Sequence, residues 1–469
     1  MNTPKASSYD PRTFKALTFH DAVARFGDGG DTPRAYLERC LETIAAREPV
    51  VKAFAATNVP AARAAADESS ARWKSNRALS PIDGLPIGIK DLLETKDMPT
   101  EMGCEAYRGN FPKRDNAAVW ALRQAGCVIL AKTTTAELGG SHPPATTNPF
   151  DPARTAGGSS SGSAAAVAAR MLPAAIGTQV GGSIIRPAAF CGNFALKPTQ
   201  GGINRGERQA TSMSTHGVHA GCIEDMWQVA IEIAARAGGD RGCQGLTGSM
   251  TPPPAQKPRR LMVLETEGWS RLDEPSKSAF TQVLDAIARE GVTLVTRQKS
   301  AEVEAMERAI ANATAVASGI TGWENRWATR NLVDQHPEGV SARAKTVLAK
   351  AEAMSPADYR ALLLERELAQ ATYARIAHVA DAAITLTCPG PAPLWAGDQP
   401  GQPLAPRPTG DAVFNYPSSM LFAPAVTMPL LAVGGMPVGV QLMGRPHEDE
   451  RITGFARWLA GAVSPVVVG

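Results

Sequence analysis

Apolar residues near the N-terminus recur at helical spacing. They do so in two segments within residues 17–58, and the second segment opens with Thr32 followed by Pro33. A capping threonine followed by proline at the first helical position is a common helix start. The pattern therefore predicts a helical N-terminal layer over residues 15–75.

The next stretch alternates predicted strands and helices. Residues 82–90 carry closely spaced apolar side chains among glycines and a proline, and they end on Lys90. Residues 117–125 return to helical spacing, and residues 127–131 form a short apolar run typical of a buried strand. This alternation predicts an α/β architecture in which Lys90 is the last residue of a core strand.

A loop rich in Gly, Ser, Thr, Pro and Asn follows over residues 139–163, before an alanine-rich helix at residues 164–169. A long loop that leads into a buried helix is uncommon unless it is functional. The second half continues the α/β pattern without an internal repeat. Its predicted parts are a linker at 252–257, a strand at 261–264, a helix at 276–290, a helical region at 301–368, a strand at 383–386 and a Pro/Gly-rich run at 389–408.

The composition is that of an ordinary globular protein. Of 469 residues, 44% are hydrophobic and 20% are charged, which excludes a mainly disordered chain. The 48 basic and 45 acidic residues give a formal net charge of +3 and form no clustered basic face. We therefore expect no nucleic-acid partner.

The cysteines and the lengths of the apolar runs predict an intracellular location. The seven cysteines are scattered, with no Cys-x-x-Cys pair and no zinc-ligand spacing, which favours a reduced, intracellular environment. Residues 1–10 lack the apolar core of a signal peptide, and no run of about 18 uncharged apolar residues occurs. We expect a cytoplasmic protein that does not bind a membrane.

Residues 157–163 read Gly-Gly-Ser-Ser-Ser-Gly-Ser. Glycines in such a segment let hydroxyls and backbone amides approach a ligand closely. The segment resembles a phosphate-binding loop, but the Lys-Ser/Thr ending of a P-loop is missing. Taken alone, it would be interpreted as a flexible linker.

Further motifs change that interpretation. In order along the chain they are the Gly/Ser-rich segment at 157–163, a second Gly-Gly-Ser unit ending the segment 174–183, Pro-Ala-Ala-Phe-Cys-Gly at 187–192 and Leu-Lys-Pro-Thr at 196–199. With these motifs the sequence resembles the amidase signature family. The resemblance covers residues 15–459, weakly between 205 and 400. Its other matching segments are 84–91, 148–154, 409–415, 424–429 and 435–442.

The resemblance implies a catalytic triad. It makes Ser183 the nucleophile, Ser159 a bridging hydroxyl whose preceding peptide bond is cis in the family, and Lys90 the general base. A serine hydroxyl is a weak nucleophile until a base removes its proton, and a buried lysine can be that base because burial disfavours its charged form. An isolated lysine at a strand end would more often belong to a structural ion pair.

The resemblance also implies an oxyanion hole made of the backbone N–H groups of Val180, Gly181, Gly182 and Ser183. Backbone donors depend on the path of the chain, so valine at position 180, where relatives often have Thr or Ile, should be harmless. Each donor lost from such a hole costs about 3 kcal/mol of transition-state stabilisation.

Two positions depart from the family pattern. Gln179 stands where the family usually has Asp, and Ile185 stands where it often has Arg, with Arg186 displaced by one residue. If relatives pair that Asp with that Arg in a buried salt bridge, losing both avoids an unpaired buried charge. Restoring Asp alone at position 179 should therefore destabilise the fold.

Further candidates for contact with substrate are Met102, Gly103, Ser160, Trp323 and Trp327. The two tryptophans lie one helical turn apart in the least matched region. They suit either a pocket for an acyl or aromatic group or core packing.

His216 and His219 could suggest a metal site. Two histidines without a third nearby ligand are insufficient for one. We expect a polar loop with hydrogen-bonded imidazoles, and no metal or other cofactor.

The fold implied by the resemblance is one α/β domain with a mixed central sheet of roughly ten strands between helices. Its expected parts are a helical layer at 15–75, a catalytic signature core at 76–204, a variable, substrate-shaping region at 205–400, and closing strands and a helix at 401–460.

The implied reaction is hydrolysis of a carbon–nitrogen bond in a small aryl or aliphatic amide through an acyl-enzyme. Carbamates and esters are alternative substrates for the same nucleophile. We expect a monomer or homodimer that acts on a small molecule. The alternative is an A-type glutaminase subunit of a tRNA-dependent amidotransferase, which requires stable partner chains. A binding protein that lost its activity is disfavoured, because all three triad residues are present.

Overall fold

The computed structural model describes residues 8–140, 142–207, 211–399 and 401–469. The first seven residues of the polar N-terminal segment lie outside it. The helices are α1 (His20–Gly27), α2 (Pro33–Val51), α3 (Val59–Lys74), α4 (Ala117–Gln124), α5 (Ser161–Ala168), α6 (Ile185–Phe190), α7 (Ile223–Ala237), α8 (Glu274–Arg289), α9 (Ala301–Ala309), α10 (Ala313–Gln335), α11 (Ala342–Glu352), α12 (Pro356–Arg375), α13 (Tyr416–Met420) and α14 (Asp449–Ala462).

A twelve-stranded sheet runs through the described part of the chain, with neighbours in the order β1-β3-β2-β4-β6-β5-β10-β11-β9-β7-β8 and with β12 beside β10. Parallel and antiparallel pairs both occur. The strands are β1 (Phe54–Thr57), β2 (Pro86–Lys90), β3 (Val128–Thr133), β4 (Ala174–Gln179), β5 (Phe194–Lys197), β6 (Thr215–Ala220), β7 (Arg260–Val263), β8 (Thr293–Val295), β9 (Ala382–Leu386), β10 (Ala425–Val433), β11 (Met436–Met443) and β12 (Val466–Val468). The mixed α/β fold is confirmed.

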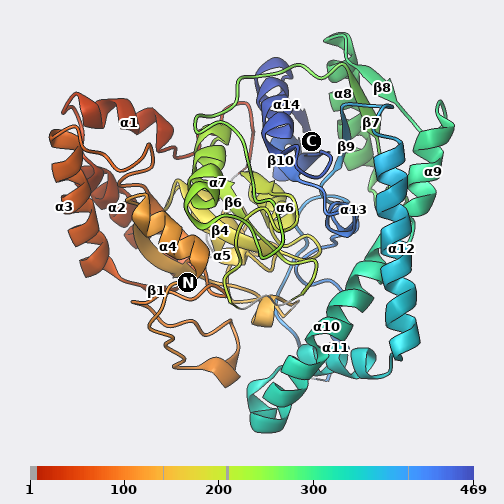
Figure 1. Cartoon of the computed structure of the whole chain (residues 1–469), viewed down its shortest axis with the longest axis horizontal. Coiled ribbons are helices and arrows are strands. Elements are labelled where there is room, and N and C mark those ends of the chain that lie inside the picture. Colours follow the sequence, from red (N-terminus) through yellow and green to blue (C-terminus); the bar gives the residue numbers. More distant parts are fainter. Residues whose placement is uncertain (1–7, 141, 208–210, 400) are drawn as a thin grey trace.

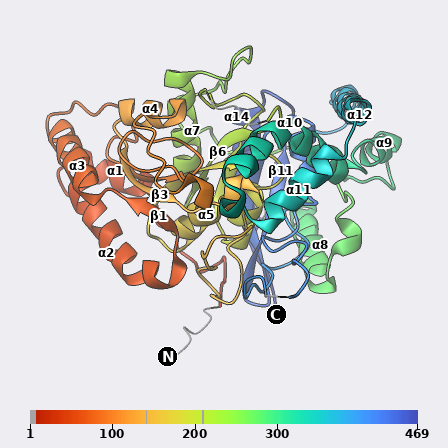
Figure 2. The same cartoon turned by 90° about the horizontal axis from the view of Figure 1, so that it is seen from below.

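Helices flank the sheet, and Figures 1 and 2 both place α1–α3 at one end of the molecule and α9 and α12 at the other. The predicted start of α2 is confirmed, because the Thr32 side chain accepts a hydrogen bond from Ala35 N and Pro33 begins the helix. The region 205–400 combines helices with the strands β6 to β9. β7 and β9 lie where the sequence predicted strands at 261–264 and 383–386, whereas β6 and β8 were not predicted.

The strands nearest the candidate site are buried at every position. β2 lies between β3 and β4 and is parallel to both. A strand covered on both faces needs apolar residues throughout, which explains the continuous apolar run that ends on Lys90. Within the described ranges, no helix has both the length and the apolar character needed to cross a lipid bilayer.

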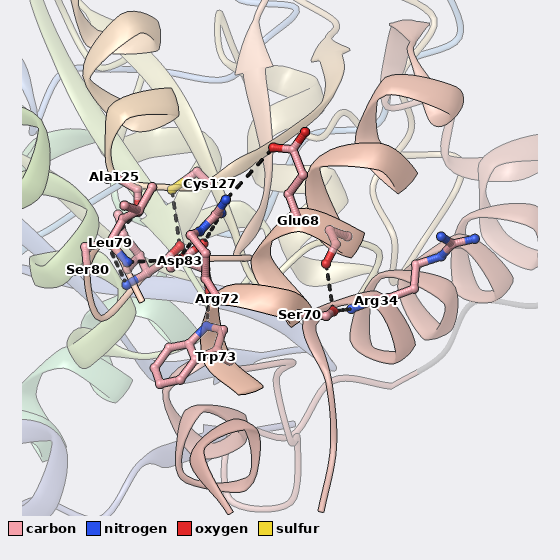
Figure 3. Close-up of polar contacts among 12 residues, drawn as sticks. Arg34, Glu68, Ser70, Arg72, Trp73, Leu79, Ser80, Asp83, Ala125 and Cys127 are labelled. Atoms are coloured by element: carbon pink, nitrogen blue, oxygen red, sulfur yellow. Dashed lines mark hydrogen bonds and ion pairs between the residues drawn. The ribbon is translucent and has the colours of Figure 1, made fainter. Parts of the chain in front are cut away.

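A buried ion pair ties α3 to the segment that leads into β2 (Figure 3). Arg72 donates to Asp83 through Nε (2.8 Å to Oδ2) and Nη2 (2.6 Å to Oδ1). Trp73 Nε1 donates to the Asp83 carbonyl at 2.9 Å, and Leu79 N donates to Oδ2 at 2.9 Å. The side chain of Asp83 is fully buried, so these donors fix the chain just before the strand that carries Lys90.

Replacing Arg72 by alanine should lower the free energy of unfolding by about 3 kcal/mol, because the Asp83 carboxylate would stay buried without its cation. Urea denaturation would measure the loss. The matched control is Arg63→Ala on the same helix, whose pair with Glu38 is exposed and should contribute at most about 1 kcal/mol. Equal losses in the two variants would contradict the assigned role.

Candidate active site

The amine of Lys90 lies inside the fold at the end of β2. Lys90 Nζ is 2.7 Å from Ser159 Oγ, 2.9 Å from Thr178 Oγ1 and 3.4 Å from the Thr178 carbonyl. The lysine side chain is completely buried, and all of these partners are uncharged. An ammonium group in this place has no carboxylate to compensate the loss of water.

Burial lowers the pKa of Lys90 well below its ordinary value, and the nearby guanidinium of Arg186 lowers it further. Desolvation penalises the charged form of an amine, and a neighbouring positive charge acts in the same direction. The amine is therefore held toward its neutral form, in which its lone pair can accept a proton.

Ser159 lies in the Gly/Ser-rich segment that leads into α5. The peptide bond between Gly158 and Ser159 is cis, as the family resemblance implied. Ser159 is buried, and its carbonyl accepts a hydrogen bond from Ala136 N at 3.0 Å. Its hydroxyl lies 2.7 Å from the Lys90 amine; it accepts a hydrogen bond when the lysine is an ammonium and can donate to the lone pair when the lysine is neutral.

Ser183 lies in the turn between β4 and α6. Its carbonyl accepts a hydrogen bond from Ser160 N at 3.2 Å, which brings this turn against the segment that carries Ser159. Ser183 is partly exposed, whereas Lys90 and Ser159 are buried. Within the described ranges its hydroxyl makes no hydrogen bond. The structure thus gathers the three predicted residues around one loop contact, with the predicted nucleophile on the accessible side.

The turn from Val180 to Ser183 needs its glycines. A Cβ atom on Gly181 would lie 2.6 Å from the ring of Tyr416, and one on Gly182 would collide with the side chain of Asn415. Both contacts are closer than real Cβ atoms allow. These residues of α13 and its N-cap therefore press on the turn, and the sequence analysis did not identify them.

Gln179 closes the same turn. Its Oε1 atom accepts hydrogen bonds from Ile184 N at 2.9 Å and Ile185 N at 3.0 Å, and its Nε2 atom donates to Ser419 Oγ at 3.4 Å. A neutral amide thus satisfies two donors and one acceptor at once. Ile185 packs in a small apolar cluster, so no arginine side chain approaches Gln179 from that position.

Gln179→Asp should lower the free energy of unfolding by about 2 kcal/mol, measured by thermal and urea denaturation. The shorter side chain loses the bond to Ser419 and buries a charge for which position 185 supplies no cation. The two backbone donors offset only part of this cost. Gln179→Glu keeps the reach and isolates the effect of charge. Unchanged or increased stability of the Asp variant would contradict this explanation.

Thr178 is a further contact of Lys90 that the sequence analysis missed. It lies on β4, next to Gln179, and its hydroxyl and carbonyl both face the Lys90 amine. Strand alternation could not have identified it, because Ile176 pairs with Ile89 and alternation would place Thr178 on the face of Ile89 instead of that of Lys90.

Three of the predicted substrate contacts, Met102, Gly103 and Ser160, are held in place by backbone contacts. The Met102 carbonyl accepts from Leu138 N at 2.9 Å, and a Cβ on Gly103 would lie 2.6 Å from the Thr135 carbonyl. This loop therefore packs closely on the segment that precedes the Gly/Ser-rich loop. The hydroxyl of Ser160 is buried and bonds to the Thr178 backbone at 3.2 Å, which favours a role in fixing β4.

The two tryptophans have different surroundings. Trp323 stacks on Tyr359 with 5.4 Å between ring centroids, and the Arg326 guanidinium lies 3.4 Å from its centroid. Trp327 is 66% exposed, so core packing is wrong for it. No hydrogen bond or ring contact joins either tryptophan to Lys90, Ser159 or Ser183 within the described ranges.

The prediction of a polar loop with hydrogen-bonded imidazoles at His216 and His219 is wrong. Both residues lie in β6, and both are buried. No ring nitrogen of either one has a hydrogen-bond partner in the part of the chain that the structure describes. Burial first, and then the positive charges nearby, lower the pKa of each to about 3, so both are neutral at physiological pH.

Comparison with known proteins finds relatives over most of the chain. A family model described as "Amidase" matches residues 35–453. The chain is 32% identical over 470 aligned residues to the A-type subunit of glutamyl-tRNA(Gln) amidotransferase from Chloroflexus aggregans, with 92% of this chain and 93% of that one covered. The corresponding protein of Anaeromyxobacter sp. (strain K) is 30% identical, with 92% and 93% covered.

Solved structures agree with the fold. A crystal structure of an amidase superposes with a TM-score of 0.82 at 27% identity, covering 96% of this chain and all of that one. A peptide amidase from Stenotrophomonas maltophilia superposes with a TM-score of 0.75 at 24% identity, covering 96% and 98% of the two chains. The latter likeness concerns the fold alone.

Proposed function

Because the chain belongs to the amidase family, whose model spans residues 35–453, we propose that it cleaves the carbon–nitrogen bond of an amide with Ser183 as nucleophile. The observation that carries the proposal is the 2.7 Å contact between the buried Lys90 amine and Ser159 Oγ. A buried, uncharged environment suits a lysine that must accept a proton.

In the proposed reaction Ser183 Oγ attacks the amide carbon, and its proton passes through Ser159 to Lys90. The tetrahedral intermediate collapses as the same relay returns the proton to the departing nitrogen, which releases an amine or ammonia and leaves an ester on Ser183. Water then attacks the ester, again giving a proton to the relay. The products are a carboxylic acid and the free enzyme.

The N–H groups of Val180, Gly181, Gly182 and Ser183 are the proposed donors to the oxyanion of both intermediates. Support comes from the closeness of Tyr416 and Asn415, which hold the glycine turn in one path. Donors fixed before the reaction need no reorganisation when charge develops, and this is usually the largest catalytic term.

The substrate has two candidates. The first is a small aryl or aliphatic amide cleaved by the chain alone, with carbamates and esters as further substrates. The second is glutamine, cleaved by an A-type glutaminase that works with partner chains. The names of the relatives at 30% to 32% identity favour the second candidate over the first, whereas the match to a solved amidase at 27% identity is compatible with either.

Two measurements test these proposals. A serine-directed fluorophosphonate probe should label the wild-type chain and leave Ser183→Ala unlabelled; equal labelling would remove Ser183 as the nucleophile. The purified chain should then be assayed with glutamine, aryl amides, aliphatic amides and carbamates. Turnover of simple amides without any partner supports the first candidate. Glutamine hydrolysis that requires co-purifying chains supports the second.

A further inference from the structure

Arg186 is a buried cation with no acidic partner. Its side chain enters the core from α6, where Nη1 donates to the Gly410 carbonyl at 3.0 Å and Nη2 donates to the Gly158 carbonyl at 2.5 Å and to Thr409 Oγ1 at 3.1 Å. Its Nε atom has no hydrogen-bond partner, and no carboxylate lies within ion-pair distance among the described residues. An uncompensated buried charge is costly.

The guanidinium of Arg186 joins two backbone segments close to the candidate site. Gly158 is the residue before Ser159, so the guanidinium holds the carbonyl of the peptide that carries the bridging serine. Thr409 and Gly410 belong to the segment that leads to Asn415. The side chain of Asn415 packs against the glycine turn. The carboxylate whose charge acts on Arg186 is that of Asp411, and it is already paired with Arg271 and Arg407.

We propose that Arg186 is a positioning residue: it fixes Ser159 against Lys90 through the Gly158 carbonyl, and this contact holds its unpaired positive charge one residue from the serine that contacts the Lys90 amine. The inference rests on the proposed function, because it assigns Arg186 a task in the relay from Ser183 to Lys90. Arginine suits this task, since it stays charged when buried and its planar group can hold two chain segments at once.

The other charged and titratable groups near Lys90 do not take over this electrostatic task. Burial and Arg186 together lower the pKa of Lys90. The groups that face the end of β2 from the packed elements are His216 and His219 on β6, which are neutral, and Lys132 on β3, which pairs with Asp91 at 2.8 Å. Arg186 is therefore the cation that remains without a counter-charge.

The test measures the rate at which a fluorophosphonate probe labels Ser183, from about pH 5 to about pH 10, a range that lies below the ordinary pKa of a lysine. The wild-type rate should rise with pH as Lys90 loses its proton. In Arg186→Gln the midpoint should move to higher pH by about one unit, because a positive charge that opposed protonation is gone. At pH values below both midpoints the labelling rate should fall about tenfold.

Arg186→Lys separates the two effects, because it keeps the charge and loses the two-segment hydrogen bonding. Its midpoint should stay at the wild-type value while its maximal labelling rate falls. If Arg186→Gln does not fold, Arg186→Lys still tests the positioning role through its maximal labelling rate. The control is Arg343→Gln, a buried arginine paired with Asp398, which should lose stability without moving the midpoint.

The outcomes are distinguishable. An unlabelled wild type would overturn the proposed function itself. A labelled wild type together with an unshifted midpoint in folded Arg186→Gln would overturn the electrostatic role alone. A full labelling rate in Arg186→Lys would overturn the positioning role.

Discussion

Ser183→Ala should lower kcat/KM for the cleaved amide by a factor on the order of 10⁶, the loss found when a serine nucleophile is removed from a hydrolase whose triad acts as a unit. The hydroxyl is the only group proposed to bond covalently to substrate, so no other side chain replaces it. KM should change much less, because the pocket keeps its shape. Steady-state kinetics on the best substrate from the panel measures both.

The control for Ser183→Ala is Ser161→Ala in the Gly/Ser-rich segment. Ser161 Oγ donates to the Gly157 carbonyl at 2.7 Å, and among the described residues it makes no hydrogen bond to Lys90, Ser159 or Ser183. Its loss should reduce stability by about 1 kcal/mol and leave kcat within tenfold. A Ser183→Ala enzyme that retains more than a thousandth of wild-type turnover would contradict the assignment.

Lys90→Met should lower kcat by about 10²-fold to 10⁴-fold, the usual contribution of a positioned general base. Methionine keeps an unbranched side chain of similar length in the apolar strand, so the fold should persist. Activity should recover in part at high pH, because hydroxide can replace the base. Wild-type activity in this variant would show that Lys90 is structural.

Lys90→Met should also change how the free energy of unfolding depends on pH. The pKa of Lys90 is lowered in the folded state, so between the folded and unfolded values the unfolded chain binds one more proton. Stability contributed by this group is therefore lost as pH falls through that window and gained as pH rises, by about 1.4 kcal/mol per pH unit. Lys90→Met should lack this part of the slope. Urea titrations at several pH values, compared with wild type, measure the difference.

Local patterns in the sequence were sufficient to predict several elements. The N-cap at Thr32 with Pro33, and the apolar run ending on Lys90, depend only on neighbouring residues, and both agree with α2 and β2. The order of strands depends on distant pairings instead. β5 lies beside β10, more than two hundred residues later, and no periodicity along the chain contains that information.

The candidate site shows the same limit on a smaller scale. Motif spacing placed Lys90, Ser159 and Ser183 in one family pattern, and the structure brings their segments together. It could not show the task of Arg186, because a shift of one residue along a helix rotates a side chain by about 100°. Ile185 thus enters an apolar cluster, while the arginine that follows reaches Gly158 and Gly410.

The sheet order has a consequence for shortened forms of this protein. β10 and β11 come late in the sequence yet sit between β5 and β9, in the middle of the sheet. A ribosome must therefore finish almost the whole polypeptide before the strands carrying Lys90 and the glycine turn can join the rest. A nonsense mutation ahead of Ala425 should yield insoluble material, and the signature segment produced by itself should not be an active mini-enzyme.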